Sequence, residues 1–191
     1  MNASAQQQHR TSAQSASAYK RAEAQVIESS AEPTQYLTFM LAGEVFAIGI
    51  LAIKEIIEYH SLTEVPMMPA CVRGVINLRG AVVPVMDLLA RFGQEPSQIT
   101  KRTCIVIVEV PSGDERQVIG VVVDAVNEVL DIAPEDIEPP PTFGARIRSD
   151  FIQGMGKVKN KFVILLDVNH VLSIDELSGL SLISSEAGGG E

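Results

Sequence analysis

The sequence predicts an all-β protein with minor α content, organised as two small β-barrels in tandem. Hydrophobic residues make up 46% of the 191-residue chain and aromatic residues 5%, so aliphatic side chains must fill the core, and the β-branched ones favour strands. Short apolar runs alternate with turn residues along the chain. The chain also repeats its own pattern, and barrel closure removes the exposed edges of such short strands.

Two strand-turn-strand units open the two halves of the chain. In each unit an apolar run is followed by a short polar stretch and a second apolar run, which is the pattern of a β-hairpin. The predicted units are residues 36–41, 42–44 and 45–50 in the first half, and residues 103–110, 111–116 and 118–123 in the second.

Two longer blocks repeat without a gap. Residues 45–57 (VFAIGILAIKEII) align with residues 118–130 (VIGVVVDAVNEVL), and residues 73–88 align with residues 153–168. The second copy has seven extra residues between its blocks, at a proline-rich stretch typical of an extended loop. We therefore expect barrel one over about residues 35–100 and barrel two over about residues 101–172.

Short helices are predicted after the last strand of each copy. Asp87 and Asp167 occupy equivalent positions there, and an aspartate at such a position caps the N-terminus of a helix. The first of these helices is predicted over residues 88–92, ending at Gly93. A further helix is predicted near the C-terminus, over residues 174–182.

The two ends of the chain are predicted to be disordered. Residues 1–34 are rich in Ala, Ser and Gln, and a segment so poor in large apolar groups cannot offset the entropy of ordering. Residues 183–191 form the second disordered end.

The internal repeat separates residues that build the fold from residues with another role. Gly74 is shared with the second copy, and Gly80 aligns with Asn160; because Gly and Asn most readily adopt positive φ, Gly80 is expected to shape a tight turn. Asp87 is likewise structural. Apolar residues recur at the other aligned positions and are expected in the core, among them Val75/Met155, Leu78/Val158, Val82/Phe162 and Val85/Leu165.

The copies differ at the tip of the first hairpin, where Asn77 and Arg79 stand opposite Lys157 and Lys159. Two interpretations are open from these residues alone. One is a solvated hairpin tip with no partner. The other is an exposed donor fork that awaits a carboxylate or a cluster of carbonyls on a partner, a task that Arg performs better than Lys.

The acidic residues Glu55 and Glu128 are also repeat equivalents. This equivalence argues against a catalytic carboxylate pair, because it places the two side chains in separate barrels. We expect each to be a surface charge, with Glu55 beside Ile53 and Ile56 on a contact edge.

Composition excludes several classes of function. The formal net charge of −9 offers no attraction to nucleic acid or an acidic membrane. His9, His60 and His170 have no second ligand at metal spacing, so no metal site or cofactor is expected. No nucleophile has a base at a recognisable spacing, and no stretch of about 18 apolar residues predicts a membrane span. The sequence therefore favours a non-enzymatic cytoplasmic protein.

As a group, four blocks of the chain resemble the CheW family of chemotaxis coupling proteins. The blocks, in their order and spacing, are VRGVINLRG (residues 72–80), VPVMDL (residues 83–88), IKEI (residues 53–56) and IGVVVD (residues 119–124). The similarity covers roughly residues 35–180. The N-terminal tail is longer than most members carry.

The resemblance implies two SH3-like five-stranded β-barrels and a non-enzymatic adaptor that couples methyl-accepting chemoreceptors to the histidine kinase CheA. It implies a cytoplasmic location, in association with membrane-bound receptor arrays. Two alternatives remain: a coupling protein of a related pathway, such as pilus-driven motility, and a small-barrel module that binds peptides or nucleic acid.

The resemblance also implies two contact surfaces. The receptor surface would comprise Arg79, Asn77, Val75, Ile53 and Glu55. The kinase surface would comprise Leu51, Ile56 and Ile57, on the end of the first barrel.

Overall fold

The computed structural model describes residues 32–141 and 147–173. The predicted C-terminal helix and disordered end lie outside these residues, and so does almost all of the predicted N-terminal tail. Thr34, the last residue assigned to that tail, begins the first strand. No helix in the two described ranges is long and apolar enough to cross a membrane.

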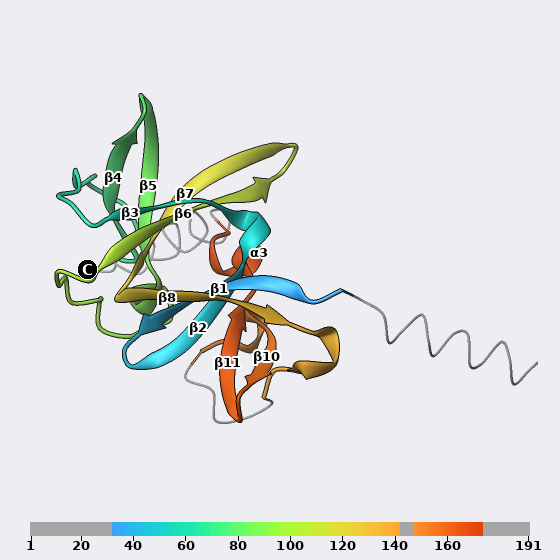
Figure 1. Cartoon of the computed structure of the whole chain (residues 1–191). Coiled ribbons are helices and arrows are strands. Elements are labelled where there is room, and N and C mark those ends of the chain that lie inside the picture. Colours follow the sequence, from blue (N-terminus) through green and yellow to red (C-terminus); the bar gives the residue numbers. More distant parts are fainter. Residues whose placement is uncertain (1–31, 142–146, 174–191) are drawn as a thin grey trace, which may run out of the picture.

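The described residues form strands joined by short turns and a few single-turn helices (Figure 1). This confirms the all-β class with minor α content. The strands are β1 Thr34–Leu41, β2 Glu44–Gly49, β3 Ile53–Glu58, β4 Val72–Leu78, β5 Ala81–Asp87, β6 Cys104–Ser112, β7 Glu115–Val123, β8 Ala125–Ile132, β9 Ile137–Glu138, β10 Ile152–Val158 and β11 Lys161–Leu166. The α-helices are α2 Leu88–Arg91 and α3 Val168–Val171, and the 3₁₀ turns are η1 Ile50–Ala52, η2 Pro134–Asp136 and η3 Ser149–Phe151.

The strands form two sheets, and each sheet takes strands from both copies of the repeat. One sheet has the order β8-β1-β2-β11-β10-β9, and the other has the order β3-β6-β7-β5-β4. Strand β3 of the first copy thus pairs with β6 of the second, while β8 pairs with β1. The expected division into a barrel over residues 35–100 and a barrel over 101–172 therefore does not describe the sheets. The local pattern of a strand is the same whichever copy supplies its neighbour, so the repeat alone did not reveal this exchange.

The repeat itself is confirmed by the strand register. Gly74 on β4 pairs with Val85, and Gly154 on β10 pairs with Leu165, each just after an equivalent irregularity in the ladder. Both glycines allow a close approach, since a Cβ on Gly74 would lie 2.5 Å from the carbonyl oxygen of Thr63. The structural role predicted for Gly74 follows from this contact.

Apolar side chains gather in three clusters. The largest lies between the sheets and includes Phe39, Phe46 and Phe151. A smaller cluster around Val85 and Ile107 forms the core of the five-stranded sheet, and another around Leu165 forms the core of the six-stranded sheet. Each sheet therefore closes over its own core, and the largest cluster joins the two.

The β4–β5 and β10–β11 hairpins share one turn geometry. Arg79 and Gly80 have φ of 51° and 88°, and Lys159 and Asn160 have φ of 48° and 61°. A two-residue turn with positive φ at both positions matches the right-handed twist of the strands that it joins. The positive φ predicted at Gly80 is confirmed.

The predicted caps are present in both copies. The carboxylate of Asp87 accepts hydrogen bonds from the backbone N–H groups of Leu89 and Ala90, and that of Asp167 accepts from Asn169 and His170. The first helix ends before Gly93, whose φ is 76°, as the sequence predicts.

Two expectations from the sequence are wrong, one about core residues and one about the length of a turn. Val82 and Phe162, expected in the core, have exposed fractions of 72% and 51%, because their strands turn Val83 and Val163 inward and alternate residues face outward. The turn expected over residues 111–116 is shorter: β6 continues to Ser112 and β7 begins at Glu115.

Candidate interaction site at Glu55 and Arg79

An ion pair joins the two outer strands of the five-stranded sheet. Glu55 lies on β3, at one end of the strand order, and Arg79 lies in the turn after β4, at the other end. The guanidinium donates from Nη1 to Glu55 Oε1 at 2.6 Å and from Nη2 to Oε2 at 2.8 Å. This bidentate geometry fixes the direction of the arginine side chain.

The position of Glu55 follows from the alternation of β3. Ile53, Glu55 and Ile57 are half-buried, whereas Lys54, Ile56 and Glu58 point to solvent. Glu55 thus places a carboxylate on the inner side of an outer strand, a feature that discourages edge-to-edge association of sheets. The exposed fractions of the Glu55 and Arg79 side chains are 24% and 76%.

The ion pair keeps the guanidinium of Arg79 oriented. The hydrogen bonds from Arg79 to Glu55, and then the charge of Glu55, raise the pKa of the guanidinium above its ordinary value. Because the pair is open to water, its contribution to folding stability is small. Its consequence is the presentation of a fixed cation at the hairpin tip.

The structure corrects one part of the sequence hypothesis. One interpretation had Arg79 present its donor fork to a carboxylate or a cluster of carbonyls on a partner, but two of its donors are engaged by the carboxylate of Glu55 in the same chain. Sequence reasoning named both residues without pairing them. Their contact depends on closure of the barrel, which brings two strands 24 residues apart together.

The other predicted receptor residues lie on the same two strands. Asn77 Oδ1 accepts a hydrogen bond from Gly80 N at 2.8 Å, so this side chain holds the turn that carries Arg79. The backbone of Val75 exchanges hydrogen bonds with Thr63 at 2.8 and 3.0 Å. Ile53 packs against the largest apolar cluster. These three residues therefore hold the strands and the turn that carry the site.

The second copy has no equivalent ion pair. Glu128 lies on β8 and Lys159 in the β10–β11 turn, so both belong to the six-stranded sheet. Within the described ranges, no salt bridge joins these two side chains. The prediction that Glu55 and Glu128 lie in separate barrels is confirmed, and the arrangement at Arg79 is specific to the first hairpin.

The residues predicted to contact the kinase differ in accessibility. Leu51, in η1, has an exposed fraction of 96%, and Ile56 has one of 42%. Ile57 packs against the core of the five-stranded sheet. Leu51 also lines a pocket of about 320 Å³ between the η1 turn and the start of α3. Leu51 and Ile56 are therefore available to a partner, while Ile57 supports them from inside.

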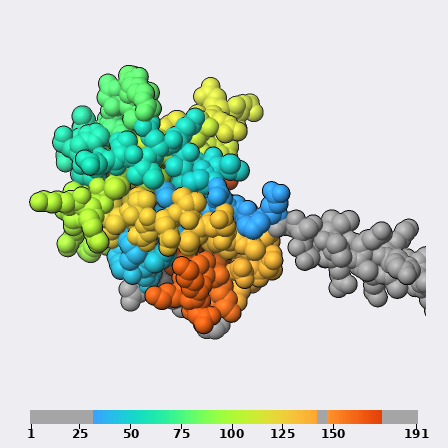
Figure 2. Space-filling model, viewed as in Figure 1, coloured from blue at the N-terminus to red at the C-terminus, as the bar shows by residue number. Residues whose placement is uncertain are grey.

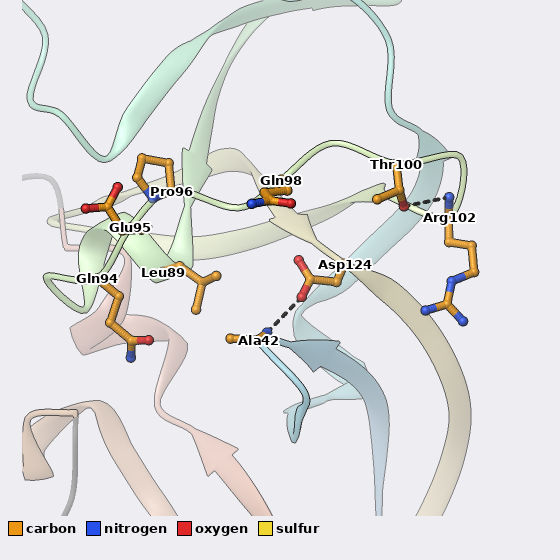
Figure 3. A pocket seen from close by; sticks show the side chains of 9 residues that line it. All are labelled: Ala42, Leu89, Gln94, Glu95, Pro96, Gln98, Thr100, Arg102 and Asp124. Atoms are coloured by element: carbon orange, nitrogen blue, oxygen red, sulfur yellow. Dashed lines mark hydrogen bonds between the residues drawn. The ribbon is translucent and has the colours of Figure 1, made fainter.

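A larger pocket of about 570 Å³ lies beside the connection between α2 and β6 (Figure 3). Asp124, which aligns with Leu51, accepts a hydrogen bond from Ala42 N at 2.7 Å. On the opposite wall, Thr100 Oγ1 accepts from Arg102 N at 3.2 Å. Both contacts fix the walls of the pocket. Across the described residues, no group of His, Cys, Asp or Glu side chains is arranged to hold a metal ion.

A buried polar cluster behind β4 was not foreseen. Asp87, which is fully buried, accepts hydrogen bonds at 2.8 Å from Arg73 Nε and Ser97 N. Arg73 also donates to the carbonyl oxygen of Ser97. The cluster holds the connection between α2 and β6 against β4. The available signal was the contrast between Arg73 and its repeat partner Gln153 beside two matching aspartates.

Comparison with known proteins gives concordant matches over most of the chain. A family model described as a CheW-like domain matches residues 35–176. The chemotaxis protein CheW of Klebsiella aerogenes is 32% identical over 144 residues, which cover 75% of this chain and 84% of that protein. The probable chemotaxis protein CheW of Rhizobium etli is 32% identical over 74% of this chain and 89% of its own.

A solved structure and a partial match complete these comparisons. The scaffolding protein TtCheW from Thermoanaerobacter tengcongensis superposes with a TM-score of 0.66 at 35% identity, covering 73% of this chain and 87% of that one. Protein PilI of Pseudomonas aeruginosa is 31% identical over 71 residues, which are 37% of this chain and 40% of that protein. The SH3-like double-barrel fold is the one that the solved relative shares.

Proposed function

The chain belongs to the CheW-like family, and from this membership we propose that it is a non-enzymatic scaffold coupling chemoreceptors to the histidine kinase CheA. Its solved relative is described as a scaffolding protein. In this proposal the protein works on the cytoplasmic side of the membrane, where its contacts with both partners hold them in a receptor array.

The Glu55–Arg79 pair is the observation that carries the receptor side of the proposal. A guanidinium has five N–H donors, and Glu55 engages two of them. Within the described residues the others have no hydrogen-bond acceptor, and in this proposal they meet acceptors of a receptor tip. Because Glu55 already balances the charge, the site suits a polar surface of carbonyl and amide groups better than an isolated carboxylate.

The supporting residues preorganise this site. The carboxamide of Asn77 fixes the turn, and Val75 anchors β4 through its backbone bonds to Thr63. A contact made by a rigid hairpin avoids the entropy of ordering a loop on binding. In the proposed complex Arg79 contacts the receptor, Glu55 orients Arg79, and Asn77, Val75 and Ile53 hold them in place.

The kinase side of the proposal rests on Leu51 and Ile56. A leucine side chain that is almost fully exposed at the rim of a pocket is accessible to the apolar surface of a partner, and burial there would remove it from water. Leu51 lies in the η1 turn just before β3, and Ile56 lies on β3 next to Glu55. We therefore assign the kinase regulatory domain to this side of the molecule, adjacent to the receptor site.

A pull-down from the native cell lysate tests the coupling function. The intact chain should retain both a chemoreceptor and a histidine kinase, and Arg79→Glu protein should retain the kinase and lose the receptor. Identification of the receptor also decides whether the output is chemotaxis or a related pathway such as pilus-driven motility. Retention of neither partner class by the intact chain would contradict the proposal.

A further inference from the structure

The β10–β11 hairpin has a positively charged tip on an acidic chain. Lys157, Lys159 and Lys161 fall within five residues and are all exposed. The chain as a whole has a formal net charge of −9. Within the described part of the chain, none of the three lysines forms a salt bridge. Among the described residues, their charges are therefore not balanced by a direct ion pair.

An aromatic side chain lies beside one of these lysines. Phe162 is 51% exposed, and it stands directly opposite Lys157 in the register of the hairpin. Cross-strand partners share one face of a sheet, so the side chains of Phe162 and Lys157 both lie on the outer face. At the equivalent place in the first copy, Val82 stands opposite Asn77, without charge.

The hairpin is held rigidly at its base. Val163 and Leu165 are buried in the core of the six-stranded sheet, and β11 pairs with β2. The turn between the strands has the two-residue geometry described above. A rigid hairpin presents its side chains without the cost of ordering them on binding.

We propose that this basic hairpin, defined by Lys157, Lys159, Lys161 and Phe162, binds a short acidic segment of a partner protein. Carboxylates of the segment would pair with the lysines, and an apolar side chain of the segment would cover Phe162 on the face that it shares with Lys157. Figure 2 shows the hairpin, in orange, projecting from the end of the molecule opposite the β4–β5 hairpin, in green. The surface is thus separate from the Glu55–Arg79 site and does not rest on the proposed coupling function.

Charge and size favour an acidic protein segment over other anionic partners. Adsorption to an anionic membrane takes clusters of about four to eight basic residues, and nucleic-acid binding takes a broader basic surface. Both extended polyanions would also meet the repulsion of a chain with net charge −9. A short segment with a few carboxylates contacts the lysines and avoids the acidic remainder.

Fluorescence anisotropy with a labelled peptide of alternating glutamate and leucine tests this surface. We expect the triple variant Lys157→Gln/Lys159→Gln/Lys161→Gln to bind it at least about tenfold more weakly than the intact chain. The matched control is Lys101→Gln/Arg102→Gln/Arg116→Gln, which removes the same charge from exposed positions elsewhere and should bind as the intact chain does. Thermal melting of each variant verifies that it is folded.

Two further arms identify the chemistry of the ligand. Phe162→Ser should abolish the preference for this peptide over a peptide of alternating glutamate and serine. Raising the salt concentration from 0.1 to 1 M should weaken binding, because the Debye length shortens. Equal peptide binding by the two triple variants would overturn the proposal. So would tighter, lysine-dependent binding to phosphatidylglycerol vesicles or to an oligothymidine strand than to the peptide.

Discussion

Glu55 and Arg79 close the five-stranded sheet by a bidentate ion pair between its two outer strands, at 2.6 and 2.8 Å. The contact gives one hairpin tip a cation whose direction is fixed by the fold. Its repeat equivalents, Glu128 and Lys159, make no such pair within the described residues. This difference between two otherwise matching hairpins is the basis of the receptor contact proposed for Arg79.

The first prediction is that Arg79→Glu weakens binding to the receptor tip by at least about thirtyfold. The substitution removes the donors and sets a second carboxylate beside Glu55. The fold should persist, because exposed substitutions seldom change stability appreciably. Titration of the purified chain against a receptor tip, with a thermal melt of each protein, measures both effects.

Arg116→Glu is the matched control for this prediction. Arg116 has an exposed side-chain fraction of 77%, close to the 76% of Arg79, and it also pairs with a glutamate, Glu109. The control should leave receptor binding within about twofold of the intact chain. An equal loss of binding from both substitutions would show that net charge, and not the site at Arg79, governs the interaction.

Local chemistry was sufficient to predict most strands, turns and caps. The positive φ at Gly80 follows from its alignment with Asn160, and the cap at Asp87 from its place after an apolar run. Both depend on residues adjacent in sequence. The internal repeat supplied a second example of each feature, which separated the role of Gly80 from that of Arg79.

Features that depend on distant contacts were not predictable in this way. The exchange of β3 and β8 between the sheets leaves no local trace, since each strand has the same alternation beside either neighbour. The pairing of Glu55 with Arg79 follows from barrel closure, and that of Asp87 with Arg73 follows from the path of the connection at Ser97. In each case the sequence shows which residues are present but not which of them are in contact.

The second prediction is that Asp87→Ala lowers the free energy of unfolding by about 3 to 5 kcal/mol, because it leaves Arg73 without its buried partner. The substitution also removes a helix cap and the acceptor of Ser97 N. The counterpart substitution Asp167→Ala also removes a helix cap, but the Asp167 side chain is 30% exposed. It should lower the free energy of unfolding by only about 1 kcal/mol. Urea denaturation of both variants provides the comparison, and similar losses would contradict a special role for the Asp87 cluster.

The third prediction concerns Glu109, whose pKa lies below its ordinary value because of hydrogen bonds from Lys54 and then Arg116. Because this pKa is lower in the folded state, ionised Glu109 stabilises the protein at pH values above its unfolded-state pKa of 4.5. This stabilisation is lost as the pH falls through the folded-state pKa. The difference in thermal midpoint between the intact chain and Glu109→Gln should therefore shrink from pH 6 to pH 3. A difference that is constant or grows with acidity would show that the three charges do not interact in solution.

The last prediction is that Leu51→Glu weakens binding to the kinase regulatory domain by about thirtyfold while receptor binding is retained. Leu51 is 96% exposed at the edge of a pocket, so the change should leave folding intact, and a buried apolar anchor at an interface commonly contributes an effect of this size. Met67→Glu is the control, since Met67 is 97% exposed on the β3–β4 connection and this variant should bind normally.

The repeat supplies a second pair of variants. Ile56→Glu should weaken kinase binding, and Val129→Glu, at the equivalent and similarly exposed position of β8, should not. Loss of binding from Val129→Glu alone would move the kinase surface to the six-stranded sheet.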